Sequence, residues 1–236
     1  MKEEKKTKDL IIEELQEMHE KVAELEKVKV RCNQLEKELK QSYKKLQKFI
    51  EGTTHIIMKV VEIRDPYSTG HQQRVSQLAT AIAQEMKLPK DKIEGVRFAS
   101  LVHDIGKFNL PTEIVSKPNK LSEVEFNFIK NHPKVGYDIL RKVDFPWPIA
   151  EIVFQHQEKI DGSGYPRGLK GDEIFVEAKI LGVANAIEAM SSSRSYRPAI
   201  SVEESLVEIS RNKNILFDPE VVDACLRLFK EKGFKF

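Results

Sequence analysis

Residues 68–89, STGHQQRVSQLATAIAQEMKLP, carry their apolar side chains in steps of three and four. These positions are Val75, Leu78, Ala79, Ile82 and Met86. Because an α-helix has about 3.6 residues per turn, this spacing places them on one face. The stretch therefore predicts an amphipathic helix that packs on a hydrophobic core.

The same period recurs downstream, and capping residues mark where several helices begin and end. The markers are Ser122 with Glu125, Ser201 with Glu204, and Asp218 with Pro219 at a start, and Gly106, Pro133 and Gly233 at a stop. The apolar segment 92–107, KIEGVRFASLVHDIGK, is expected to be a short helix stopped by Gly106. No stretch alternates with the period of a strand, so the predicted fold class is all-α, with helices packed around one core.

The first 50 residues differ from the rest, because they contain no glycine and no proline. Their apolar positions form a heptad-like seam, consisting of Ile11, Leu15, Met18, Val22, Leu25, Val28, Cys32, Leu35, Leu39, Ser42, Leu46 and Phe49. The spacing slips at Leu25–Val28, which is typical of a stammer. We expect residues 1–51 to be a coiled-coil linker that joins two chains in a parallel homodimer. The alternative is one solvated helix packed on its own globular domain, residues 52–236.

Composition excludes several classes of function. The 236 residues have a formal net charge of +2, with 32% charged side chains of mixed sign. This gives no electrostatic case for binding a nucleic acid polymer or an anionic membrane. The two cysteines, Cys32 and Cys225, are too few for a disulfide framework. Neither a membrane-spanning segment nor a secretory signal is evident, so the predicted location is the cytoplasm.

Four histidines and one aspartate are the candidates for chemistry. His103 and Asp104 lie side by side in an otherwise apolar segment, ASLVHDIGK, and His71, His132 and His156 lie at predicted helix ends. A histidine at a helix end can simply favour the negative end of the helix dipole. A buried carboxylate, however, is costly without a partner, and a metal ion is a partner that binds imidazole and carboxylate groups. Lys107 could then meet an anionic substrate.

Two further segments could bind a nucleotide. The glycine-rich loop 161–174, DGSGYPRGLKGDEI, is long for a connection within a helical domain, and its Tyr165 could stack on a base. The segment 191–198, SSSRSYRP, holds Arg194 and Arg197, whose guanidinium groups suit phosphate oxygens. The alternatives are a surface turn for the loop and a solvated helix end for the arginines.

These motifs occur in an order that resembles the HD-GYP domain, a bacterial subgroup of the HD metal-dependent phosphohydrolases. The motifs are HDIGK, NHP, QHQEKIDGSGYPRGLKGDEI and VANAIEAMSSSRSYRP, and the resemblance covers residues 52–236. It implies an all-helical domain with two divalent metal ions, iron or manganese. It also implies hydrolysis of cyclic di-GMP to the linear dinucleotide pGpG, and often on to GMP. Such domains usually follow a sensory or receiver domain through a helical linker, and no such domain is expected in this chain.

Residue by residue, the resemblance assigns metal ligands, catalytic groups and substrate contacts. It makes His71, His103, Asp104, His132 and His156 metal ligands, with Asp104 as the bridge between two ions. It makes Asp104 and Lys107 the catalytic residues, and Lys107 also a contact to phosphate. Tyr165, Arg194 and Arg197 match positions that bind the cyclic dinucleotide. Some members bind a third metal through a glutamate where this chain has Tyr67, which argues against a third ion here.

Two positions depart from the family pattern at the metal site. Gln157 stands where a second consecutive histidine is usual, and Asn185 stands where a ligand aspartate is usual; Ser195 also replaces a proline. Amide oxygens are neutral and weak ligands beside imidazole or carboxylate, so each metal is expected to lose affinity. Three hypotheses remain: an active cyclic di-GMP phosphodiesterase, a degenerate domain that binds cyclic di-GMP or signals as a dimer without turnover, and a phosphohydrolase of another nucleotide.

Overall fold

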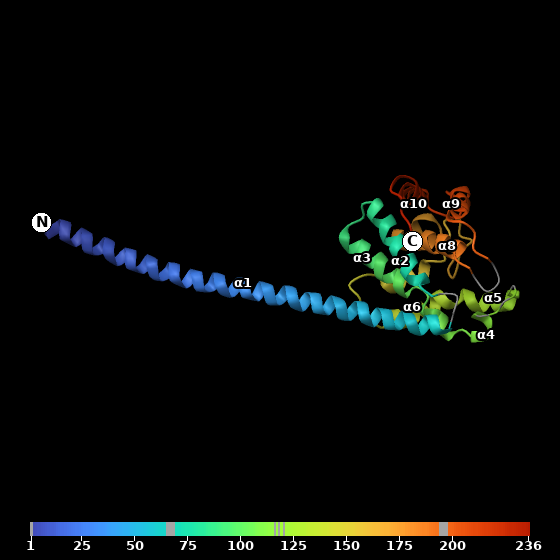
Figure 1. The fold of residues 1–236 in the computed structure, drawn as a ribbon, viewed down its shortest axis with the longest axis horizontal. Coiled ribbons are helices and arrows are strands. Elements are labelled where there is room, and N and C mark those ends of the chain that lie inside the picture. Colours follow the sequence, from blue (N-terminus) through green and yellow to red (C-terminus); the bar gives the residue numbers. More distant parts are fainter. Residues whose placement is uncertain (1, 65–68, 116, 118, 120, 194–197) are drawn as a thin grey trace. The chain divides into compact units, whose positions relative to one another are not determined.

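Helices make up most of the part that the computed structural model describes, which leaves out residues 1, 65–68, 116, 118, 120 and 194–197. Within those described ranges the extended contacts are isolated bridges, Asp161–Lys170 and Lys213–Phe217. The predicted all-α fold is therefore confirmed (Figure 1). The helices are α1 Lys2–Arg64, α2 His71–Glu85, α3 Lys90–Val102, η2 Ile105–Asn109, α4 Thr112–Val115, α5 Glu123–Lys130, α6 His132–Leu140, α7 Ile149–Gln155, η3 Gly171–Glu173, α8 Val176–Ser191, α9 Val202–Arg211 and α10 Pro219–Glu231.

The contacts within the chain divide it into residues 1–53 and residues 54–236. The first unit is part of the long helix α1, and its apolar seam, including Leu39 and Phe49, is exposed to solvent. Among the described residues, none of the helices combines the length and the apolarity needed to cross a bilayer.

The core of residues 54–236 forms where helix α2 packs against α3 and α8 (Figure 1). The apolar face predicted for α2 is correct, because Val75, Leu78, Ala79 and Ile82 are all fully buried. The other large apolar side chains that are fully buried in this core are Ile149, Ile152, Ile180, Leu181, Ile187 and Ile209. Burying such a side chain contributes roughly 1.5–3 kcal/mol, so this core stabilises the packing of the helices whose ends carry the candidate polar residues.

Most of the predicted helix boundaries hold, because capping is a local property of the chain. Ser122 and Ser201 each form both hydrogen bonds of a capping box, and the Asp218 side chain caps α10. The prediction for Gly106 was wrong: α3 already ends at Val102, and Gly106 lies inside the 3₁₀ helix η2.

A close approach of backbones explains why residue 106 is glycine. A Cβ atom there would lie 2.0 Å from the His132 carbonyl oxygen and 2.7 Å from the Gly136 amide nitrogen. The missing side chain therefore lets η2 pack directly on the start of α6. Pro133 was expected to mark the end of a helix, and α5 does end before it, at Lys130. Pro133 also lies in the first turn of α6.

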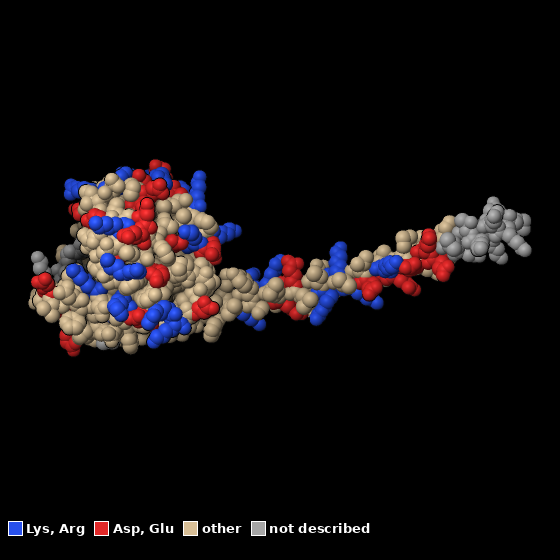
Figure 2. All heavy atoms as spheres, turned by 180° about the vertical axis from the view of Figure 1, so that it is seen from behind, with Lys and Arg blue, Asp and Glu red and all other residues tan. Residues whose placement is uncertain are grey.

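The surface of residues 54–236 mixes both signs of charge on the face shown in Figure 2. Basic and acidic side chains are interspersed there and form no single large field. The observation agrees with the balanced composition.

Candidate metal centre

The four candidate histidines and Asp104 converge in one buried cluster. His71 is the first residue of α2, His103 and Asp104 follow the end of α3, His132 begins α6, and His156 follows α7. Each of these five residues is at most 2% exposed. Side chains that are far apart in the sequence are thus brought together by the ends of four helices.

Three of these histidines are oriented by the ends of helices. Each Nδ1 donates a hydrogen bond to the carbonyl oxygen three residues earlier, with His103 on Ser100 at 2.7 Å, His132 on Ile129 at 2.7 Å and His156 on Val153 at 2.6 Å. Carbonyls in the last turn of a helix have no partner within that helix, so they are available as acceptors. Because a carbonyl only accepts, Nδ1 carries the proton and Nε2 carries the lone pair.

The charge states suit metal binding. Burial lowers the pKa of His103 to about 4 and, with the neighbouring histidine, lowers the pKa of His132 to about 3 and that of His156 to about 3. These imidazoles are therefore neutral at neutral pH. Burial by itself would raise the pKa of Asp104, but His103 and Lys107 hold it well below its usual range. The cluster thus combines neutral imidazoles with an ionised carboxylate.

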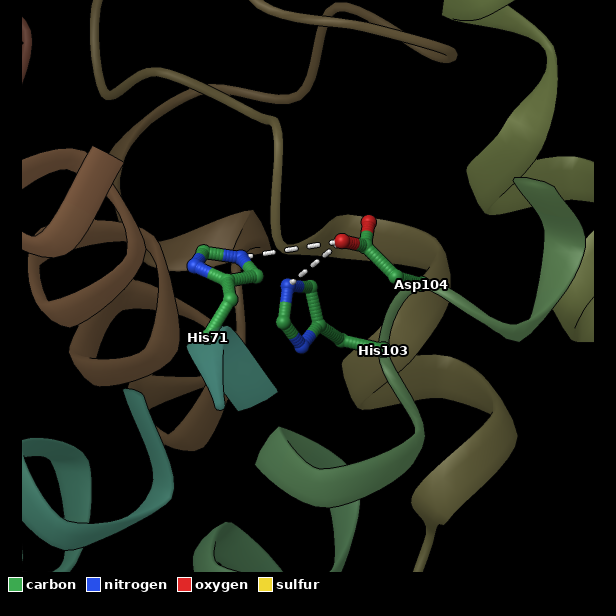
Figure 3. Close-up of side chains that lie close together, drawn as sticks. All are labelled: His71, His103 and Asp104. Carbon is green, nitrogen blue, oxygen red and sulfur yellow. Dashed lines mark ion pairs between the residues drawn. The ribbon is translucent and has the colours of Figure 1, made fainter. Parts of the chain in front are cut away.

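Asp104 faces two groups of histidines with its two oxygen atoms. Figure 3 shows one of these groups, in which one oxygen of Asp104 faces both His71 and His103. Its Oδ2 lies 3.6 Å from His71 Nε2 and 3.5 Å from His103 Nε2. Its Oδ1 lies 3.6 Å from His132 Nε2, and His156 completes that side. We call His71, His103 and Asp104 the first group. We call Asp104, His132 and His156 the second group.

The donor atoms fit divalent metal ions. His103 Nε2 is buried and has no hydrogen-bond partner among the described residues. The Nε2 atoms of His132 and His156 face each other at 3.3 Å, although both carry lone pairs. A cation between such atoms removes both conflicts, and two atoms bound to one ion at about 2.1 Å lie about 3.0–3.5 Å apart. The residues present therefore fit a metal ion in each group.

The two positions that depart from the family pattern differ in their surroundings. Gln157 is half-buried, and its Nε2 lies 3.2 Å from His156 Nε2, so its amide borders the second group. A rotation of that amide by 180° would place its oxygen there instead. Asn185 is half-buried on α8, one helical turn before Glu188.

Glu188 contacts the cluster, although the motifs did not point to it. It is fully buried on α8, its Oε2 accepts a hydrogen bond from His71 Nδ1, and its Oε1 accepts bonds from Arg74 and Ser192. Burial would raise the pKa of Glu188, but the bonds from His71, Ser192 and Arg74 lower it to about 2. The sequence carried a signal, since Glu188 is an acidic residue within the apolar run VANAIEAM, as Asp104 is in its own segment.

Lys107 and Tyr165 lie at the edge of the cluster. The Lys107 ammonium donates a hydrogen bond to Asp104 Oδ2 at 2.8 Å, and its side chain is 19% exposed. The Tyr165 ring packs edge-on to the His132 ring, with 6.5 Å between the centroids. Arg194, Arg197 and Tyr67 lie outside the described residues.

A buried carboxylate shapes the glycine-rich loop. Glu158 accepts hydrogen bonds from the backbone amides of Arg167 at 2.7 Å and Leu169 at 3.0 Å. Gly164 is needed where the loop turns back, because a Cβ atom there would lie 2.4 Å from the Glu158 Cα. The loop that carries Tyr165 is thus anchored two residues after His156.

A family model with the description "HD domain" matches residues 55–221. The chain belongs to the HD domain family. This match confirms the relationship that the motifs predicted, and it includes all the candidate ligands of the HD domain described above.

Curated proteins from bacteria are similar to this HD-domain chain. It is 37% identical over 209 residues to a cyclic di-GMP phosphodiesterase of Thermotoga maritima, covering 88% of this chain and 57% of the relative. It is 35% identical over 204 residues to the cyclic di-GMP phosphodiesterase response regulator RpfG of Xanthomonas campestris, covering 86% of this chain and 54% of that protein. The chain therefore spans little more than half the length of these relatives.

Solved structures share the helical fold of this HD domain. The cyclic GMP-AMP specific phosphodiesterase V-cGAP3 of Vibrio cholerae superposes with a TM-score of 0.57 at 18% identity, covering 75% of this chain and 49% of that one. The HD domain of the phosphodiesterase PgpH from Listeria monocytogenes, in complex with cyclic-di-AMP, gives 0.54 at 19% identity, covering 77% of this chain and all of that one. At these identities the likeness concerns the fold alone.

Proposed function

We propose that this chain is a metal-dependent phosphodiesterase domain that hydrolyses cyclic di-GMP to pGpG, to GMP or to both. The observation that carries the proposal is Asp104, whose two oxygens face two groups of buried histidines. The names of the relatives from Thermotoga maritima and Xanthomonas campestris support the substrate.

The first and second groups would each hold one divalent ion, with Asp104 shared between them. Imidazole nitrogens with carboxylate oxygens suit iron or manganese, which we propose as the resident metals. When bound, such a pair of ions supplies an activated water and neutralises charge on the phosphoryl oxygens. No serine or cysteine nucleophile is paired with a histidine among the described contacts, so the metal groups are the source of reactivity that the chain offers.

The chain's own residues would bind and orient the substrate. The Lys107 ammonium lies beside Asp104, so it would contact a phosphoryl oxygen and hold it against the two groups. The Tyr165 ring, which borders His132, would stack on a guanine base. We also propose Arg194 and Arg197 as phosphate contacts, because the resemblance assigns them that role.

The first test compares the natural chain with a variant that restores the usual ligands, Gln157→His/Asn185→Asp. We expect the natural chain to hydrolyse cyclic di-GMP with Mn(II) or Fe(II), and the variant to bind metal about 10–100-fold more tightly. Metal content by mass spectrometry and product analysis by chromatography measure both. The control variant, Gln77→His/Asn127→Asp, makes the same changes at two exposed positions.

The outcomes of this test separate the hypotheses. Binding of cyclic di-GMP without turnover, rescued by Gln157→His/Asn185→Asp, would replace the enzyme by a domain that only binds the nucleotide. Faster turnover of 3'3'-cGAMP than of cyclic di-GMP would contradict the substrate, and this comparison is needed because another relative is a 3'3'-cGAMP-specific phosphodiesterase of Vibrio cholerae.

We further propose that α1 joins two copies of the chain in a parallel coiled coil. The heptad steps that include Leu46 and Phe49 continue to Ile56, Val60 and Ile63, which are 65%, 44% and 79% exposed. The opposite face of these turns is buried, with Thr54, Met58 and Glu62 at 5–6% exposure. An exposed apolar stripe on a helix that already packs on its other side supports a second copy as the occupant.

Charges beside the seam favour the parallel arrangement. Lys21 and Glu26 are five residues apart at flanking positions of the heptad, as are Arg31 and Glu36. In a parallel pair of helices, such positions on opposite chains lie next to each other. Input from a sensory or receiver domain and a location in the cytoplasm stay predictions.

Changing the stripe should weaken dimerisation. We expect Ile56→Ser/Ile63→Ser to raise the dimer dissociation constant at least about tenfold, because each change removes apolar area worth more than 1 kcal/mol. Sedimentation equilibrium measures this constant. Ile215→Ser, which changes a side chain that is 54% exposed outside α1, is the control. A natural chain that stays monomeric at micromolar concentration would refute the proposed dimer.

A further inference from the structure

Glu188 is a buried charge beside the cluster that the ligand motifs do not explain. Its side chain is fully buried, and its two oxygens have different partners. Oε1 accepts hydrogen bonds from Arg74 Nε at 2.8 Å, Arg74 Nη2 at 2.6 Å and Ser192 Oγ at 2.7 Å. Oε2 accepts the hydrogen bond from His71 Nδ1. Arg74 and Ser192 therefore hold one oxygen in place and leave the other directed at a candidate ligand.

The position of His71 explains why it needs such a partner. His103, His132 and His156 follow the end of a helix, where free carbonyls are available to their Nδ1 atoms. His71 is the first residue of α2, so the carbonyls of its own helix lie after it in the chain and not before it. Its acceptor comes from α8, and among the four clustered histidines it is the one whose Nδ1 bonds to a carboxylate.

The first group contains little negative charge of its own, so the contact between Glu188 and His71 matters for binding a cation. Asp104 is the one carboxylate of that group, and its second oxygen faces the second group. Asn185, which stands where the resemblance places a ligand aspartate, is neutral. The first group is therefore short of negative charge for a divalent ion, unless a nearby anion acts through one of its ligands.

Glu188 is placed to be that anion. A carboxylate that accepts from Nδ1 makes the imidazole more basic at Nε2 and holds the ring in one orientation. His71 Nε2 is the atom that lies 3.6 Å from Asp104 Oδ2. Arg74 offsets part of the charge, but its side chain is 34% exposed and its field is screened by water, whereas the Glu188 side chain is 1% exposed.

We propose that Glu188 is the positioning residue of the first group, and that it supplies through His71 the negative charge that Asn185 does not. The inference rests on the proposed metal binding. It concerns the affinity for metal and not the turnover. A chain that binds two ions but hydrolyses nothing would overturn the proposed function and leave this inference standing.

The test is the variant Glu188→Gln, which keeps an acceptor oxygen and removes the charge. We expect the affinity for one Mn(II) ion to fall about 10–100-fold, while the other ion stays bound. Titration calorimetry measures both affinities, and electron paramagnetic resonance shows the loss of the spin-coupled pair of Mn(II) ions. Adding Asn185→Asp to Glu188→Gln should restore the pair. Equal affinities in the variant and the natural chain, or equal loss of both ions, would overturn the proposal.

Two further variants separate charge from a merely structural role. Glu177→Gln is the matched control, because Glu177 is also buried on α8 and pairs with Lys92 at 3.2 Å, outside both groups. Arg74→Gln keeps Glu188 and removes the opposing charge, so the first ion should bind as tightly as in the natural chain or more tightly. A loss of the first ion in Arg74→Gln would show that only the packing of this network matters. This outcome would overturn the proposal even if Glu188→Gln fails to fold.

Discussion

Replacing Asp104 by asparagine should release both metal ions and lower the rate of cyclic di-GMP hydrolysis at least about 10³-fold. The reason is that both groups share this carboxylate, with Oδ2 facing His71 and His103 and Oδ1 facing His132. Asparagine offers one neutral oxygen, and its amide nitrogen would repel a cation in the other group. Lys107 would also lose the anion to which it donates a hydrogen bond.

Metal content and turnover measure the effect of Asp104→Asn, and Asp144→Asn is its control. Asp144 is exposed, so its replacement should leave both quantities unchanged. Retention of two ions per chain in Asp104→Asn would show that the carboxylate does not bridge the two groups.

Replacing Gly106 by alanine should lower the free energy of unfolding by about 3 kcal/mol or more. The added Cβ atom would meet the His132 carbonyl oxygen at 2.0 Å, and backbone atoms cannot move aside as a flexible side chain does. The start of α6 would have to shift, and His132 with it, so we also expect weaker binding in the second group. Urea unfolding and metal titration measure the two effects.

Gly95→Ala is the matched control for Gly106→Ala. Its Cβ atom would approach the Trp147 side chain at 3.3 Å, and a small shift of that side chain relieves the contact. Alanine is favoured over glycine within a helix by about 1 kcal/mol, and this gain offsets the cost of moving the Trp147 side chain. The free energy of unfolding should therefore change little. Equal stability of Gly106→Ala and the natural chain would mean that η2 and α6 do not pack as closely as described.

Local signals in the sequence predicted the helices well. The apolar face of α2 and the capping boxes at Ser122 and Ser201 depend on residues within a few positions of each other. The motif HDIGK was also informative, because adjacent polar residues in an apolar segment need a partner wherever the chain folds. Patterns in the sequence thus predicted the helical fold, and the resemblance to the HD-GYP domain predicted that the four histidines cluster with Asp104.

The remaining features depend on contacts between distant segments. Gly106 was expected to stop a helix, but its role follows from the backbone of α6, which no local pattern reveals. Glu188 meets His71 across 117 residues of sequence. Glu158 shapes the glycine-rich loop by accepting hydrogen bonds from two backbone amides of that loop, and no sequence pattern indicates this contact. Such contacts require the packed arrangement of helices, and sequence periodicity does not determine it.

The placement of the cluster at the ends of several helices has a consequence for biosynthesis. The first group begins with His71 near the start of the domain, and its supporting carboxylate, Glu188, is synthesised 117 residues later. A nascent chain that has emerged only through α7 has all three members of this group but not the acceptor for His71 Nδ1. Under the proposed role of Glu188, tight binding of a metal ion in the first group would therefore require that α8 has been synthesised and packed.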